Sequence, residues 1–158
     1  MIVISAFPGM GKTWYFENCQ ELHSSYDSDS SKFSKDDFPR NYIEYIKEKL
    51  KEDDRDIIFV SSHENVRQAL IDKGIHFICI YPDINMKDEM IERYKKRGSS
   101  EAFIDNIEKN YENYISSIEK MLSNSRVSGV CFTPNTYIDE HIVDEIIDYC
   151  AALDIYED

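Results

Sequence analysis

The chain has 158 residues, of which 42% are hydrophobic and 31% are charged. This balance predicts a single globular domain over residues 1–158 and excludes a disordered tail protein. Asp and Glu number 31 against 18 Lys and Arg, so the formal net charge is −13. A surface of this sign repels the phosphate backbone of DNA or RNA, which argues against nucleic acid as a partner without excluding it. Small anionic ligands are not excluded, because a local cluster of cations can bind them.

Strand and helix patterns alternate along the chain. In chain order, the sequence predicts a strand at 2–6, a helix at 12–20, a weak strand at 22–26, a helix at 41–51, a strand at 57–60, a helix at 64–73, a strand at 75–81, helices at 86–97 and 101–122, a strand at 127–132 and a helix at 138–153. Strands that are joined through helices form parallel sheets with helices on both faces. We therefore expect an α/β protein of three layers, α/β/α, with a five-stranded parallel sheet whose ligands bind at the carboxyl ends of the strands.

The sequence shows neither a transmembrane segment nor a secretory signal. No apolar run has transmembrane length, and Pro8-Gly9 interrupts the apolar stretch near the start of the chain, so no secretory leader is expected. The four cysteines are far apart, without the close Cys and His spacing of a zinc site. These patterns predict a cytoplasmic protein with reduced, mostly buried thiols and no membrane partner, and they do not determine the oligomeric state.

The strongest chemical pattern directly follows the first predicted strand. Residues 6–13 (AFPGMGKT) fit the phosphate-loop pattern G-x-x-x-x-G-K-[ST], with Ala6 in place of the first glycine. In such a loop the glycines let backbone N–H groups approach phosphate oxygens, the lysine supplies charge to the β- and γ-phosphates, and the hydroxyl residue binds Mg²⁺. The alternative is an ordinary turn between a strand and a helix. We expect ATP and Mg²⁺ as ligands, held by Pro8, Gly9, Met10, Gly11, Lys12 and Thr13.

A pair of carboxylates is the candidate partner of this loop. The predicted strand at 57–60 is followed by Ser61, not by the acidic residue that often binds a Mg²⁺-bound water. Asp27 and Asp29 follow the weak second strand, at the same expected edge of the sheet. One of them would hold the metal-bound water, and the other would orient an acceptor hydroxyl or take its proton. An exposed turn is the alternative, and the sequence does not determine which aspartate has which role.

The only dense basic cluster lies in residues 93–97. Arg93, Lys96 and Arg97 have the i, i+3 and i+4 spacing of one helix face. Arginines on a mobile segment can neutralise charge on a migrating phosphoryl group and exclude water. We therefore expect a short helical lid at about 86–100, with residues 98–100 as its hinge. A solvated face paired with nearby glutamates is the alternative.

Further candidates for binding the acceptor or the base are scattered along the chain. Arg67 or Arg40 could grip an acceptor phosphate, His63 could bond the acceptor, and Lys32 could reach its phosphate from the loop of Asp29. Each of these residues is also compatible with a structural or surface role. Asn135, in the segment that follows the last strand, lies where the edge of an adenine could rest.

Several segments together resemble a known family, the small phosphate-loop kinases that bacteriophages and prophages encode. The resemblance covers about residues 1–105 and preserves the order of six motifs, AFPGMGKT, YDSDSSKF, FPRNYIEYI, IIFVSSHENVRQAL, IYPD and ERYKKRG. More distantly, the layout is similar to shikimate, gluconate and adenylate kinases. The resemblance implies the P-loop NTPase fold, nucleoside or nucleotide kinase activity, and the host cytoplasm as location if a phage encodes the chain.

The resemblance also implies roles for individual residues. Lys12 and Thr13 would bind ATP and Mg²⁺, and Asp27 would lie near the metal. Asp29 would contact the acceptor, and Arg93 and Arg97 would be lid arginines. The expected activity is transfer of the γ-phosphoryl group of ATP to a nucleotide-type acceptor. Among such acceptors, a deoxynucleoside monophosphate is the one that we expect first. The alternatives are a kinase of polynucleotides or of modified bases in DNA, and a nucleotide-binding protein without acceptor chemistry.

Overall fold

The computed structural model describes residues 1–52 and 54–153, and strands and helices alternate through them. The strands are β1 (Ile2–Ala6), β2 (Ser25–Asp27), β3 (Ile57–Val60), β4 (Phe77–Pro82) and β5 (Val127–Phe132). The helices are α1 (Lys12–Asn18), α2 (Arg40–Glu52), α3 (Glu64–Asp72), α4 (Lys87–Lys96), α5 (Glu101–Met121) and α6 (Glu140–Ala152). Two short 3-10 turns, η1 (Ser30–Lys32) and η2 (Ile84–Met86), precede α2 and α4.

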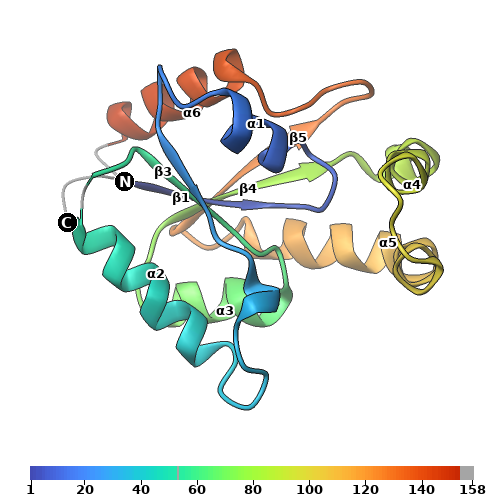
Figure 1. Cartoon of the computed structure of the whole chain (residues 1–158), viewed down its shortest axis with the longest axis horizontal. Helices are drawn as coiled ribbons and strands as arrows, with labels where there is room; N and C mark the ends of the chain where they lie inside the picture. The colour runs from blue at the N-terminus through green and yellow to red at the C-terminus, as the bar shows by residue number, and fades with distance from the viewer. Residues whose placement is uncertain (53, 154–158) are drawn as a thin grey trace.

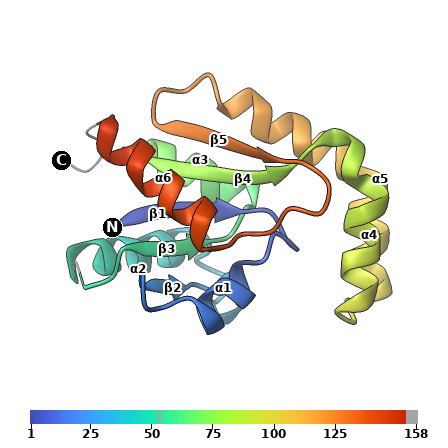
Figure 2. The same ribbon diagram turned by 90° about the horizontal axis from the view of Figure 1, so that it is seen from above.

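The five strands form one parallel sheet in the order β2-β3-β1-β4-β5. Helices α1 and α6 cover one face of the sheet, and α2, α3 and α5 cover the other (Figure 1). The α4–α5 pair stands at the edge where the strands end (Figure 2). The expected α/β architecture with a five-stranded parallel sheet between two helical layers is therefore confirmed.

The core is made by strands that are apolar on both faces. Every residue of β1, β3 and β4 is buried, whereas in the edge strand β5 only the first and last residues, Val127 and Phe132, are buried. Helices cover both faces of the central strands, so a continuous apolar run gains more burial there than an alternating one. The register pairs Ser5 with Val60 and Ala6 with Ile80, which brings the ends of β1, β3 and β4 together.

Most element boundaries differ from the sequence predictions by one to three residues, and three of the differences have a structural explanation. Strand β2 is limited to Ser25–Asp27, the residues that pair with β3. Strand β4 starts at Phe77, whose N–H bonds to the Arg126 carbonyl, because Gly74 in a left-handed conformation (φ +70°) first ends α3. Helix α6 starts at Glu140 because the Asp139 carboxylate caps it by accepting the N–H of Ile142 at 2.9 Å.

Two further findings concern membranes and thiols. Among residues 1–52 and 54–153, no helix has both the length and the apolar composition needed to cross a membrane. All four cysteines are free thiols, three of them buried and Cys131 exposed. The expectation that most of the cysteines are buried is thus confirmed.

Candidate functional site

A cleft opens where the chain leaves β1 and β3. These neighbouring strands lead to helices on opposite faces of the sheet, α1 on one and α3 on the other (Figure 1). Such a switch of faces favours a crevice at the carboxyl ends of the two strands. The cleft has a volume of about 1070 Å³, and its lining comes from 6–14, 28–30, 61–63, 89–103 and 135–139. This volume is large enough for a nucleotide together with a small second ligand.

The floor of the cleft is the loop between β1 and α1, and two glycines determine its shape. Gly9 and Gly11 have φ angles of +86° and +100°, a region that side chains rarely adopt. A Cβ on Gly9 would lie 2.9 Å from Cε1 of Tyr94, and one on Gly11 would lie 3.2 Å from the backbone nitrogen of Ile138. The loop therefore requires glycine at both positions, for conformation and for close packing.

The amide groups of this loop are free to bind a ligand. Within the described ranges, none of the backbone N–H groups of residues 9–13 donates a hydrogen bond to the protein. The flanking residues are bonded: the N–H of Phe7 bonds to the Ile80 carbonyl at 2.8 Å, and the N–H of Tyr15 bonds to the Gly11 carbonyl at 3.0 Å. A run of unbonded N–H groups between anchored ends is a site for an anion.

Lys12 and Asp27 form a pair beside the loop. The Nζ of Lys12 lies 3.7 Å from Oδ1 of Asp27, and that oxygen is buried without a hydrogen-bond partner among the described residues. Thr13 is exposed and lines the cleft. In the same part of the chain, no group of three or more His, Cys, Asp or Glu side chains could hold a metal alone. Mg²⁺ bound through phosphates needs only one or two protein oxygens, a requirement that the Asp27 carboxylate and the Thr13 hydroxyl fit.

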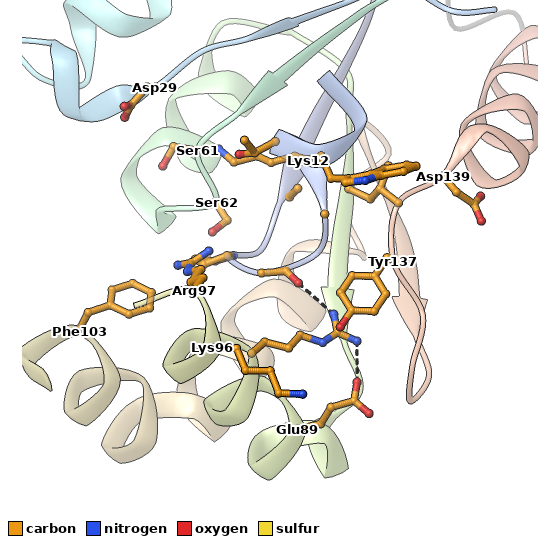
Figure 3. A pocket seen from close by; sticks show the side chains of 18 of the residues that line it. Lys12, Asp29, Ser61, Ser62, Glu89, Lys96, Arg97, Phe103, Tyr137 and Asp139 are labelled. Carbon is orange, nitrogen blue, oxygen red and sulfur yellow. Dashed lines mark hydrogen bonds and ion pairs between the residues drawn. The ribbon is translucent and has the colours of Figure 1, made fainter. Parts of the chain in front are cut away.

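Asp29 belongs to the wall opposite α4 (Figure 3). Its Oδ1 accepts hydrogen bonds from the hydroxyl of Ser31 at 2.7 Å and from the N–H of Ser31 at 2.9 Å, which caps η1. These two hydrogen bonds, with weaker help from the charges of Lys12 and Lys32, hold the pKa of Asp29 below its ordinary value. Asp29 is therefore ionised at neutral pH, and its second oxygen is available to a ligand.

A buried tyrosine is hydrogen-bonded to both loops of this wall, residues 28–30 and residues 61–63. The hydroxyl of Tyr42 donates to the Ser28 carbonyl at 2.8 Å and accepts the N–H of Ser61 at 3.0 Å. Tyr42 is fully buried in α2, and desolvation raises the pKa of its hydroxyl. Further along the second loop, Ser61 Oγ lies 2.8 Å from Nδ1 of His63. Both loops therefore have one common anchor.

Replacing Tyr42 with phenylalanine tests this anchor. The change keeps the ring but leaves a buried carbonyl and a buried N–H without a partner, so we expect a loss of about 2 kcal/mol in the free energy of unfolding. Urea unfolding measures it. Tyr45→Phe is the matched control, because the Tyr45 hydroxyl makes no hydrogen bond in the described residues. Equal stability of the two variants would contradict the anchoring role of Tyr42.

Helix α4 is docked on the loop after β1. Arg93 is buried, with its guanidinium donating to the Gly9 carbonyl at 2.9 Å, to the Thr136 carbonyl at 3.1 Å and to Glu89 at 2.6 Å. The hydroxyl of Tyr94 donates to the Pro8 carbonyl at 2.7 Å. In this structure, therefore, the helix that was expected to be a mobile lid holds the loop in place, and Arg93 is a positioning residue.

The exposed end of α4 presents charge to the cleft. Arg97 and Lys96 are exposed and line it, and the guanidinium of Arg97 lies 4.9 Å from the ring centre of Tyr94 (Figure 3). The Nε of Arg97 donates to the hydroxyl of Ser99 at 2.8 Å. Of the two arginines predicted for the lid, only Arg97 has a guanidinium that is not already committed to backbone carbonyls.

The segment after β5 forms the next part of the wall. Asn135 lines the cleft as predicted, in a left-handed conformation (φ +62°), with its N–H 3.1 Å from both Glu89 carboxylate oxygens. The ring of Tyr137 is 51% exposed and stacks 3.9 Å from the guanidinium carbon of Arg93. Trp14, the only tryptophan of the chain, is 55% exposed on the same cleft. The cleft thus has a pair of exposed aromatic rings beside the loop.

Three residues predicted to bind the acceptor do not line the cleft. Arg67 is only 3% exposed, because its guanidinium bonds to the Ser62 carbonyl at 2.9 Å and to Ser117 of α5 at 3.2 Å. Arg40 lies on the surface, where it forms an ion pair with Asp37 at 2.9 Å. Lys32 is exposed at the end of η1, outside the cleft lining. The structure therefore places these three side chains outside the cleft lining, whereas Asp29 and His63 line the cleft.

Comparison with known proteins gives little beyond this geometry. No family model matches the chain, and no curated protein matches it. Among solved structures, it is similar to the crystal structure of an uncharacterized protein from Eubacterium ventriosum ATCC 27560. That similarity has 17% sequence identity and a TM-score of 0.47, and it covers 96% of this chain and 97% of that chain. The chemistry of the cleft therefore has to be argued from its own residues.

Proposed function

We propose that the protein is an ATP-dependent phosphotransferase of the phosphate-loop type, which moves the γ-phosphoryl group of ATP to a hydroxyl group of a small acceptor. The observation that carries the proposal is the run of unbonded N–H groups at residues 9–13 next to the Lys12 ammonium. Such donors bind phosphate oxygens in many nucleotide sites. The position of the loop at the end of the central strand, in a cleft of about 1070 Å³, supports the same function.

The residues of the cleft divide the work of binding. The loop amides and Lys12 bind the phosphates, and Thr13 and Asp27 would hold Mg²⁺. When bound, this ion neutralises charge on the phosphate oxygens. We assign the base to the wall of Asn135 and Tyr137, because these residues lie beside the loop and one offers an exposed aromatic ring.

Phosphoryl transfer then requires an acceptor on the wall of Asp29. The acceptor oxygen attacks the γ-phosphorus, the bond from phosphorus to the bridging oxygen breaks, and its electron pair leaves with ADP. Because the pKa of Asp29 is lowered, this carboxylate orients the acceptor hydroxyl better than it retains the proton, which passes on to the transferred phosphate. Arg97 supplies positive charge to the transferred group from the α4 side. Catalysis is thus mainly positioning and neutralisation of charge.

The kinship of the chain forms part of the same proposal. The motifs in residues 1–105 that resemble small phage and prophage kinases include the loop, the Asp27 region and α4, and all three meet at the cleft. A protein of this kind would act in the cytoplasm, which would be that of the host if a phage encodes it.

Intrinsic fluorescence gives a direct test of nucleotide binding. Since Trp14 is the only tryptophan and lines the cleft, adding MgATP should change its emission with a saturable dependence on concentration. ATP consumption is then followed with nucleosides, nucleotides and DNA oligomers as acceptors. We expect ADP release that depends on an acceptor. Binding without any acceptor-dependent release would instead indicate a nucleotide-binding protein, and no binding would contradict the proposal itself.

A further inference from the structure

The charge of the cleft lining restricts the acceptor. Four of its residues are cations and four are carboxylates, so the formal charge of the lining is zero. The cations are Lys12, Arg93, Lys96 and Arg97, and the carboxylates are Asp29, Glu89, Glu92 and Asp139. MgATP keeps a net negative charge, so once it is bound the filled cleft is negative. A second anion would therefore enter a site that already repels it.

The cations are also unevenly distributed. Lys12 is the first residue of α1, directly after the loop, and the other three lie in α4 or directly after it, on the side that faces the phosphates of ATP in the proposed function. The wall of Asp29 is built from Ser28, Ser30 and residues 61–63. Its one imidazole is uncharged at neutral pH, because burial, with the nearby charges of Arg67 and Lys12, lowers the pKa of His63. Among the described residues, no cation of the cleft lining belongs to this wall. The charges that act on Asp29 are those of Lys12, which the proposed function assigns to the phosphates of ATP, and of Lys32, which lies outside the lining.

Two arginines that could have added positive charge to the wall of Asp29 make their contacts outside the cleft. Arg67 lies in the first turn of α3, just after the loop at 61–63, but its guanidinium donates to the Ser62 carbonyl and to Ser117 of α5. Arg40 pairs with Asp37 at the surface. A phosphomonoester carries about two negative charges at neutral pH. On this wall it would meet the Asp29 carboxylate, and the described lining residues of the wall itself supply no cation to compensate.

Polar groups suited to an uncharged ligand are present on the same wall. The hydroxyl of Ser28 is buried, with 3% of the residue exposed, and has no hydrogen-bond partner in the residues described. A buried hydroxyl without a partner is unusual and indicates a missing ligand or water. The side chain of Ser62 and the second oxygen of Asp29 add further hydrogen-bonding groups. These groups match the hydroxyls of a sugar or polyol.

We propose that the acceptor is an uncharged compound with several hydroxyl groups, a nucleoside or another polyol, and not a nucleoside monophosphate. This inference rests on the proposed function and changes the class of acceptor predicted from the sequence. One acceptor hydroxyl would be oriented by Asp29, and another would bond to the hydroxyl of Ser28. The reaction converts ATP and the acceptor alcohol into ADP, a phosphomonoester and one proton.

The test compares each uncharged acceptor with its own monophosphate in the full-length protein. ADP release is measured for a panel of nucleosides and polyols and for the corresponding monophosphates, and MgATP binding is measured separately by Trp14 fluorescence. We expect kcat/KM to be at least about tenfold higher for the uncharged member of the best pair. If MgATP binds but monophosphates are the better acceptors, or if no uncharged compound is phosphorylated, the inference is wrong and nucleotide binding stands. If MgATP does not bind, the proposed function fails as well.

A pair of variants tests where the acceptor lies. Ser62→Lys adds a cation to the wall of Asp29, and Ser62→Gln adds a side chain of comparable reach without charge. We expect Ser62→Lys to shift the ratio of kcat/KM values toward the monophosphate by about tenfold, and Ser62→Gln to leave the ratio unchanged. Equal ratios in the two variants would contradict the placement of the acceptor on this wall.

Discussion

Replacing Lys12 with alanine should abolish phosphoryl transfer and leave the fold intact. The ammonium group adjoins the unbonded N–H groups of residues 9–13, so its removal takes the only side-chain cation from that part of the cleft floor. Loss of a preorganised charge at a transferring phosphoryl group reduces kcat/KM by roughly a thousandfold or more. Its one ion pair, with Asp27 at 3.7 Å, is partly exposed and contributes at most about 1 kcal/mol to stability.

Steady-state ADP release with the best acceptor measures this effect, and urea unfolding checks the fold. Lys35→Ala is the matched control, since Lys35 is an exposed lysine outside the cleft lining and should keep the parent rate. Turnover of the Lys12 variant at the parent rate would remove this residue from the mechanism. A large loss of stability in the same variant would show that the lysine supports the loop and not the reaction.

Replacing Arg93 with methionine is expected to have the largest effect on stability. The guanidinium joins the carbonyls of Gly9 and Thr136 to the carboxylate of Glu89, and the side chain is only 7% exposed. Methionine fills a similar length but leaves these acceptors without their donor. Removing one partner of a largely buried ion pair with its hydrogen bonds destabilises a protein by about 2–4 kcal/mol. For a chain of this size that corresponds to a drop in Tm of roughly 5–15 °C.

Thermal unfolding measures the change, and the affinity for MgATP provides a second readout. Because Arg93 holds the Gly9 carbonyl, its loss should loosen the loop and weaken MgATP binding along with stability. Lys95→Met is the control on the same helix, because Lys95 is exposed and its ion pair with Glu92 spans 3.4 Å at the surface. We expect that control to stay within about 0.5 kcal/mol of the parent. Parent-like stability of the Arg93 variant would show that α4 is not held by this contact.

The structure confirms the predicted elements where the signal is local. The apolar run of β1, the turn into α1 and the long helix α5 depend on neighbouring residues, so periodicity and spacing were sufficient to place them. Strand β2 was the weakest prediction, since its pairing with β3 and not its own composition limits it to Ser25–Asp27.

Side chains at a distance from the loop could not be assigned in this way. The sequence analysis predicts Arg67 as a ligand of the acceptor phosphate. Its position between Val66 and Leu70, on the inward face of α3, indicates burial instead. The sulfur of Met121 and the hydroxyl of Ser117 on α5 receive its guanidinium, at a separation of about fifty residues that no local pattern reveals. Trp14 could have been found from its place beside Thr13, as a large apolar residue on a short exposed helix.

The sequence by itself determined the order of elements and the loop at residues 6–13, because backbone conformation and burial follow from residue type and spacing along a few turns of chain. Only the tertiary structure decided which charges share the cleft. In that structure Arg67 bonds to α5, outside the cleft, and Arg93 bonds to the loop after β1. Tyr42 bonds to the loop at 28–30 on the facing wall. Electrostatic interactions act through space and weaken with distance, so the charge that a ligand meets depends on the packing of segments that are remote in the chain.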